Sequence, residues 1–305
     1  MKLVSDFDGI WTNQHKEAEY VWEFIINYLC EITNKDKNFM STTLQECRDE
    51  MNKEPFKYGW INGEMIACYY HEDPFGDNNA IFDFVNNKGV KDENEFTNKL
   101  KFIRDSILKR YESLAKFSQD SFYLSTSKFK EEGKLNAVEN TDLIVEKIKS
   151  LDTDIIIVSN SKTTKIEHVF EKAGIKAGTD GTSQILVRGE AKKFEVINSF
   201  TELPEFLKIN ENISVALRRP AYYKILSEEK PDFVIGDVFS LDLALPLYLR
   251  LNDKRFSNLK VIQRVQKYTP DWVKDFLSKK ELEGIAFLVN GVDELPEIIS
   301  SQTLN

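Results

Sequence analysis

The segment KLVSDFDGIWT, residues 2–12, opens with a short apolar run and continues directly into an acidic loop. Residues 2–5 are too few for a helix, so we predict a buried strand there. Asp6 and Asp8 follow at the point where this strand ends, and Gly9 favours a turn. Polar residues directly after a buried strand are typical of a parallel sheet with a ligand site at its carboxyl edge.

The second half of the chain repeats this pattern of short β-branched runs, separated by amphipathic stretches. We predict strands at residues 154–158, 185–187, 213–217, 233–235, 259–263 and 285–289. We predict helices at residues 165–173, 191–200, 222–229, 241–249, 270–279 and 292–299. Repeated strand–helix units favour right-handed crossovers and a parallel sheet covered on both faces. The predicted fold is therefore an α/β, Rossmann-like core.

The region between the first two predicted strands has a different texture. Residues 17–124 place apolar side chains at helical spacing with charges on the opposite faces, which predicts a mostly helical insertion. Within it, residues 58–79 contain HEDPFGDNN, a loop signal, and we expect irregular structure there. The predicted domains are a discontinuous core of residues 1–13 and 140–305 and a helical cap of residues 14–139.

The composition excludes several classes of function. Lys and Arg number 41 against 50 Asp and Glu, a net charge of −9 that repels phosphate backbones and anionic lipid. We therefore expect no nucleic-acid partner and no membrane partner. No apolar run approaches the roughly 20 residues that span a bilayer. The 3 cysteines lack CxxC spacing, which favours neither disulfides nor zinc and predicts a cytoplasmic protein.

The residues that follow the predicted strands form an acidic constellation. Because the carboxyl ends of parallel strands meet at one edge, we expect convergence of Asp6, Asp8, Ser159, Asn160, Asp237 and Asp242. Clustered carboxylates need a compensating cation, and a ligand set made of oxygens favours Mg²⁺. Two plainer interpretations remain open. Ser159 and Asn160 could be a helix N-cap, and Asp242 could be an acid favoured in the first turn of a helix.

The residue types suggest group-transfer chemistry. Asp6, held rigidly at the end of a strand, could attack an electrophile and form a covalent aspartyl intermediate. Asp8 could exchange a proton with the leaving group and then with water. Ser159 could donate a hydrogen bond to an oxygen of the transferred group.

A side-chain cation is needed to offset the charge that builds on the transferred group, and two places could supply it. Arg219, in LRRP, follows a predicted strand, while Lys192 and Lys193, in GEAKK, lie further away in the chain. We prefer Arg219, which follows a predicted strand and whose planar fork suits phosphate.

Four motifs in the same order resemble those of the haloacid dehalogenase-like (HAD) hydrolase superfamily. They are DFDGIWT at residues 6–12, VSNS at 158–161, RRP at 218–220 and GDVFSLD at 236–242. The resemblance implies that Asp6 is the nucleophile, Asp8 the general acid/base, Ser159 with Asn160 the phosphate-binding pair, and Arg219 the charge stabiliser. It also implies that Asp237, with Asp6 and the backbone carbonyl of Asp8, holds Mg²⁺ and that Asp242 supports the metal site. Trp11 is bulkier than the aliphatic residue usual in this family, and we expect it to narrow the pocket.

The predicted function is a Mg²⁺-dependent phosphatase that hydrolyses a small phosphorylated metabolite through an aspartyl-phosphate. One alternative is a binding or regulatory protein of the same fold without turnover. A second alternative is a carbon–halogen hydrolase, which needs neither a metal nor a second acid, so Asp8 and Asp237 argue against it. Neither the substrate nor the oligomeric state follows from the sequence.

The position of the helical insertion leads to one further prediction. Two connections join it to the core, so we expect hinge motion, with the active site where the cap meets the core. Closure would exclude water from the attack by Asp6. We also expect residues 58–79 to contribute side chains near the site.

Overall fold

The computed structural model describes residues 1–89 and 94–303, which divide into two compact units. The first contains residues 1–13, 62–68 and the chain from residue 136 onward. The second contains residues 14–61 and 69–135. This division departs from the predicted domain limits in two ways: residues 62–68, inside the insertion, belong to the first unit, and so do residues 136–139.

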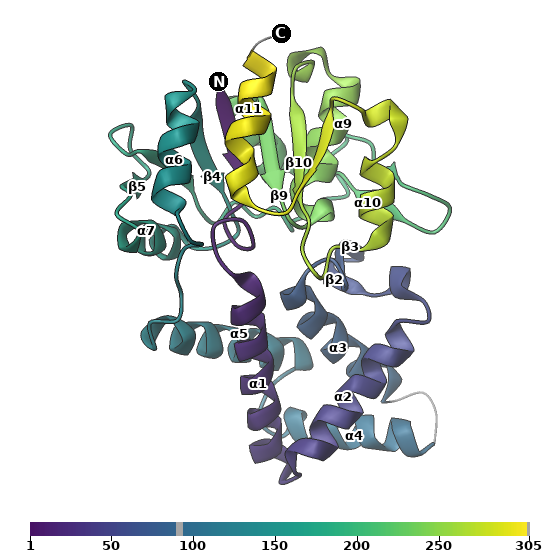
Figure 1. The fold of residues 1–305 in the computed structure, drawn as a ribbon. Coiled ribbons are helices and arrows are strands. Elements are labelled where there is room, and N and C mark those ends of the chain that lie inside the picture. The colour runs from purple at the N-terminus through teal and green to yellow at the C-terminus, as the bar shows by residue number, and fades with distance from the viewer. Residues whose placement is uncertain (90–93, 304–305) are drawn as a thin grey trace. The chain divides into compact units, whose positions relative to one another are not determined.

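The first unit is built on a parallel sheet, as predicted (Figure 1). In the described residues the sheet has seven strands in the order β11–β10–β9–β1–β4–β6–β5, and the neighbouring strands run parallel. The strands are β1 (Lys2–Ser5), β4 (Asp154–Val158), β5 (Ala177–Gly178), β6 (Ile185–Arg188), β9 (Phe233–Gly236), β10 (Lys260–Arg264) and β11 (Ala286–Val289). The α/β, Rossmann-like class predicted from the sequence is therefore confirmed.

Strand β1 lies at the centre of this sheet and is where the strand order reverses. It pairs with β4 on one side and with β9 on the other, so later strands extend the sheet in both directions. Leu3 and Val4 are buried because both faces of the sheet are covered. In open α/β sheets, ligands bind beyond the carboxyl ends of strands at such a reversal.

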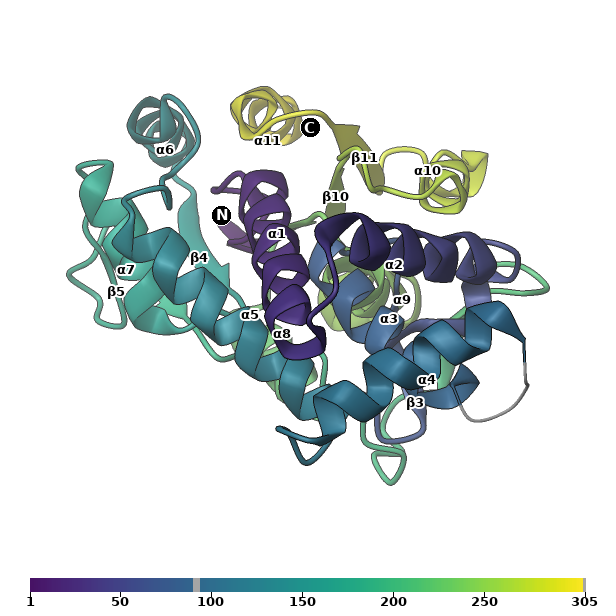
Figure 2. The ribbon, with the colours of Figure 1, turned by 90° about the horizontal axis from the view of Figure 1, so that it is seen from below.

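Helices cover both faces of the sheet. They are α6 (Thr141–Ser150), α7 (Thr163–Lys172), α8 (Pro220–Glu229), α9 (Ala244–Asn252), α10 (Asp271–Leu277) and α11 (Leu295–Thr303). Figure 2 shows α6 and α11 on one side of the sheet and α8 and α9 on the other. Within the described residues, no helix is long and apolar enough to cross a membrane.

Two sequence predictions for the first unit are wrong. Residues 191–200 form turns and loop where a helix was predicted, and the left-handed backbone of Lys192 (φ 52°) is incompatible with a helix. The strand predicted at 213–217 exists as β8 (Ser214–Ala216) but lies outside the parallel sheet. It pairs antiparallel with β7 (Phe206–Lys208), because the intervening turn brings these two short segments together.

The second unit is mostly helical, as predicted for the insertion. Its helices are α1 (Gln14–Thr33), α2 (Lys37–Met51), α3 (Pro74–Lys88), α4 (Glu95–Leu108) and α5 (Leu114–Glu131). They pack around one apolar core with many aromatic contacts, such as Tyr28 against Phe117 and Phe82 against Phe117.

The expected irregular segment at residues 58–79 is instead regular. It forms the hairpin β2 (Gly59–Asn62) and β3 (Met65–Tyr69) and then enters α3. Asp73 accepts a hydrogen bond from the backbone N–H of Phe75, and Pro74 takes the first helical position. Asp followed by Pro is a helix start as well as a turn signal, which is why this stretch resembled a loop.

Candidate functional site

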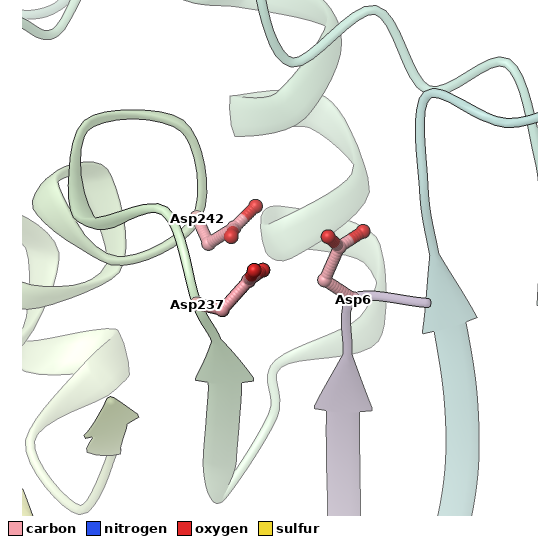
Figure 3. A group of neighbouring side chains, drawn as sticks. All are labelled: Asp6, Asp237 and Asp242. Atoms are coloured by element: carbon pink, nitrogen blue, oxygen red, sulfur yellow. The ribbon is translucent and has the colours of Figure 1, made fainter. Parts of the chain in front are cut away.

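Three of the predicted site residues, Asp6, Asp237 and Asp242, come together in the structure (Figure 3). One carboxylate oxygen from each lies within 4.8 Å of the others. Asp6 follows β1 and Asp237 follows β9, and these strands are neighbours. The cluster therefore lies at the carboxyl ends of the two strands where the sheet order reverses.

A tight turn carries Asp242 back to the end of β9. Residues Phe239–Leu243 form a π-helical turn, an irregularity often found at functional sites. Asp242 Oδ2 accepts a hydrogen bond from the backbone N–H of Val238 at 3.1 Å, and the Tyr222 hydroxyl donates to the Asp242 carbonyl at 2.8 Å. One bond thus holds the carboxylate of Asp242 and the other holds its backbone carbonyl.

Lys193 is the cation of this cluster. Its Nζ lies 2.7 Å from Asp6 Oδ1 and 2.6 Å from Asp242 Oδ1, and its side chain is 2% exposed. From the sequence, Arg219 was the preferred charge-stabilising cation and Lys193 an alternative. The structure corrects this preference, because Lys193 is the residue that contacts the carboxylates. The neighbouring Lys192 is exposed.

The backbone of the GEAKK loop explains how Lys193 reaches the carboxylates. Glu190 and Lys192 both adopt left-handed φ values, 54° and 52°. The loop is tied to the turn after β4: the N–H of Ala191 donates to the Ser159 carbonyl, and the N–H of Lys193 donates to Asn160 Oδ1 at 2.7 Å. Unfavourable backbone conformations that neighbouring bonds enforce are typical of functional sites.

Arg219 supports this loop. It is fully buried, and its guanidinium donates to the carbonyls of Ala216 at 3.0 Å, of Ala67 at 2.6 Å, and of Lys193. Its fork therefore satisfies main-chain oxygens. Through Ala67 it also links the hairpin tip of residues 62–68 to the Lys193 loop, so part of the segment expected near the site does belong to its support.

Burial and charge together set the protonation of the cluster. Burial raises the pKa of Asp6 to about 7; Asp242 and Asp8 also raise it, while Lys193 lowers it. Burial works against the charge of Lys193, but the carboxylates of Asp242 and Asp6 outweigh it and raise the Lys193 pKa. Lys193 therefore stays protonated, whereas burial disfavours the ionised form of Asp6.

Ser159 and Asn160 lie beside the cluster in buried or partly buried positions. Ser159 Oγ accepts from the N–H of Ser161 at 3.2 Å, and Asn160 positions the Lys193 backbone as described. The alternative in which they cap a helix is wrong, because α7 begins at Thr163 with Lys162 as its N-cap.

Asp8 has partners that sequence reasoning missed. Ser161 Oγ donates to Asp8 Oδ2 at 2.5 Å, and Lys165 Nζ lies 2.9 Å from Asp8 Oδ1. Ser161 is the last residue of the VSNS motif, and Lys165 lies just after it in the first turn of α7. A cation in the first turn of a helix opposes the helix dipole, and this was an available signal that Lys165 has a specific partner.

Trp11 does not narrow a pocket at the cluster. Its indole is fully buried, donates to Ser5 Oγ at 2.8 Å and packs edge-on against Phe170. The expectation of a restricted pocket is therefore wrong, because the large side chain fills the interior of the first unit.

Comparison with known proteins assigns no family. No family model matches this chain, and no curated protein matches it. Among solved structures, one similar chain is an X-ray structure of a Northeast Structural Genomics Consortium target. It is 12% identical, covers 98% of each chain and has a TM-score of 0.47.

Proposed function

We propose that this protein is a Mg²⁺-dependent phosphatase that works through an aspartyl-phosphate on Asp6. The observation that carries this proposal is the convergence of Asp6, Asp237, Asp242 and Lys193 beyond the two central strands. Of these side chains Asp6 is the most accessible, at 12% exposed against 2% for Lys193 and Asp242. Asp6 is thus the member of the cluster that a substrate can reach.

The donor set fits a hard divalent cation. Asp6, Asp237 and Asp242 carry three negative charges when ionised, and Lys193 carries one positive charge. One divalent ion would neutralise the remainder, and all available ligand atoms are carboxylate oxygens. Asp6 and Asp237 would hold it, with Asp242 supporting them because both its oxygens already accept hydrogen bonds. Bound Mg²⁺ would shield the negative charge that otherwise repels a phosphate from Asp6.

The reaction divides into two displacements at phosphorus. In the first, an Asp6 carboxylate oxygen bonds to phosphorus, the ester P–O bond breaks, and Asp8 gives its proton to the leaving oxygen. In the second, water attacks phosphorus, Asp8 takes back a proton, and the Asp6–phosphorus bond breaks to release inorganic phosphate. Lys193, 2.7 Å from Asp6 Oδ1, offsets the charge on the transferred group and holds the nucleophile in place.

The motif resemblance to HAD hydrolases supports the same reading, since the first, second and fourth motifs follow the adjacent strands β1, β4 and β9. Lys193 takes the part that the resemblance gave to Arg219. The closure of the helical unit over the site, the cytoplasmic location and the absence of a nucleic-acid partner stay predictions.

Purified protein assayed against a panel of phosphate monoesters, with and without Mg²⁺, tests this proposal. We expect metal-dependent release of phosphate from at least one monoester and its loss in Asp6→Asn. Asp154→Asn, an exposed carboxylate at the opposite end of β4, is the matched control and should keep full activity. Absence of metal-dependent turnover across the panel contradicts the proposal. Chloride release from 2-chloropropionate would favour the carbon–halogen alternative, and binding of phosphate analogues without turnover would favour the regulatory one.

A further inference from the structure

The first unit contains a second lysine that contacts an acid of the proposed site, and it differs from Lys193 in accessibility. Lys165 Nζ lies 2.9 Å from Asp8 Oδ1, and the two side chains are 20% and 17% exposed. Lys193 is 2% exposed and spans two carboxylates. Lys193 is therefore fixed inside the cluster, whereas Lys165 has room to exchange its carboxylate partner for another anion.

The position of Lys165 relative to the acid determines what it can meet. A general acid must approach the leaving oxygen to about 2.6–3.2 Å when it transfers its proton. The proposed acid is Asp8, and Lys165 Nζ lies 2.9 Å from its Oδ1. When Asp8 Oδ1 approaches the leaving oxygen, the Lys165 ammonium is therefore roughly 6 Å or less from that oxygen. A substituent one or two bonds from the ester oxygen falls within this range.

The partners of Asp8 show why such a substituent matters. Ser161 occupies Oδ2 and Lys165 occupies Oδ1, so both oxygens of the proposed acid accept hydrogen bonds in the free protein. While the Lys165 ammonium contacts Asp8 Oδ1, that oxygen is not open to the leaving group of a substrate. Removing that ammonium requires another anion to receive it.

We propose that Lys165 is a specificity residue that binds a second anionic group, a carboxylate or a second phosphate, close to the ester oxygen of the substrate. This inference rests on the proposed phosphatase function. Such a substrate draws the Lys165 ammonium away from Asp8 and leaves Asp8 Oδ1 open to the leaving oxygen. The substrate class is thus phosphate monoesters of short hydroxy acids or of compounds with two neighbouring anionic groups.

Three probes of matched size test the proposal: ethyl phosphate, carboxymethyl phosphate and 2-aminoethyl phosphate. Ethyl phosphate ends in a methyl two bonds from the ester oxygen. The carboxylate oxygens of carboxymethyl phosphate and the ammonium nitrogen of 2-aminoethyl phosphate both lie three bonds from it. The variants are Lys165→Gln and, as control, Lys162→Gln, an exposed lysine at the N-cap of the same helix. Each is assayed with Mg²⁺ for kcat and KM.

In the wild type we expect kcat/KM for carboxymethyl phosphate to exceed that for ethyl phosphate by about 10-fold or more, the usual value of a charged hydrogen bond. Lys165→Gln should remove this preference, mainly by raising KM, and should improve 2-aminoethyl phosphate relative to the other probes. Lys162→Gln should keep the wild-type order. If Lys165→Gln lowers kcat/KM by the same factor for all three probes, the proposal is overturned, because Lys165 would then act only on Asp8.

Equilibrium binding separates this proposal from the proposed function. If the enzyme hydrolyses none of the probes, the proposed phosphatase function fails for these compounds. Their affinity can still be measured by calorimetric titration of the wild type and of Lys165→Gln with carboxymethyl phosphate and ethyl phosphate. A preference for carboxymethyl phosphate that disappears in Lys165→Gln supports the role of Lys165. Equal affinity of the wild type for the two probes, or a preference unchanged in Lys165→Gln, overturns it.

Discussion

Asp242 packs so closely on Gly236 that a Cβ added to the glycine would overlap the Cβ, the carboxylate carbon and Oδ2 of Asp242. The glycine is needed here for space, because its φ lies outside the left-handed region. The last residue of β9 is therefore part of the architecture that directs Asp242 toward Lys193.

We expect Gly236→Ala to move the Asp242 carboxylate away from Lys193. A displacement of about 1 Å at a catalytic cluster can cost about 100-fold in rate, so kcat/KM should fall by about that factor. Gly181→Ala is the control, since no atom lies within 4 Å of a Cβ at that glycine. Steady-state kinetics of both variants check this, and wild-type activity in Gly236→Ala would show that Asp242 tolerates displacement.

Lys193→Met should remove the proposed cation and leave Asp6 and Asp242 without it. Activity should fall by about 100-fold or more, because loss of one charged stabilising group typically costs about 3 kcal/mol in the transition state. Because the variant leaves buried carboxylates without their cationic partner, its free energy of unfolding should also fall by about 3–5 kcal/mol in metal-free buffer. Lys192→Met, one residue away and exposed, should change neither quantity. Kinetics and urea denaturation measure the two effects separately.

Magnesium should stabilise the folded protein through the acidic cluster. A ligand that binds only the folded state at 100 times its Kd adds about 2.7 kcal/mol, so Mg²⁺ should raise Tm by several degrees. Asp237→Asn should abolish this increase, while Asp275→Asn, an exposed acid on α10, should retain it. Differential scanning calorimetry with and without Mg²⁺ provides the measurement. An equal shift in both variants would place the binding elsewhere.

Arg219→Lys should destabilise the protein even though it keeps the charge. A lysine ammonium cannot reproduce a planar fork that reaches three separated carbonyls, so buried acceptors lose their donors at about 1–3 kcal/mol each. Arg218→Lys, at a partly exposed neighbour, should cost less. Chemical denaturation compares the two, and equal losses would mean that Arg219 has no special supporting role.

The stability of the helical unit should decrease in mild acid because of His71. Burial lowers its pKa from 6.5 to about 4. Between these values the unfolded chain binds a proton that the folded chain does not, so stability falls as pH drops from 6.5 toward 4 and is unaffected above that window. The full loss is about 3 kcal/mol. In His71→Phe, the free energy of unfolding should depend less on pH between 6.5 and 4. An unchanged slope would show that His71 is not the cause of the acid sensitivity.

The sheet and the acidic cluster were predictable because they depend on a local rule. A short apolar run is a buried strand, and the residues after it lie at the carboxyl edge of a parallel sheet. Asp6 and Asp237 follow from that rule alone, whereas Asp242 reaches the edge through the π-helical turn after β9.

The choice of cation was not predictable in the same way. Arg219 follows an apolar run, but β8 belongs to a separate antiparallel ribbon, so its end does not point to the edge where the acids meet. Lys193 reaches that edge from a loop shaped by two left-handed residues, and such backbone leaves no periodic signal. Asp8 and Lys165 pair because the loop after β1 lies against the first turn of α7, an arrangement that emerges only in three dimensions.

The central position of β1 has a consequence for how the protein is made. Leu3 pairs with Ile155 in β4 and with Phe233 in β9, so β1 lacks its second neighbour until β9 has been synthesised. At usual synthesis rates this delay is on the order of ten to fifty seconds. The helical insertion is complete well before then. Strand β1, which leads into Asp6, must therefore remain unaggregated while it waits, and the acidic cluster is assembled only when β9 arrives.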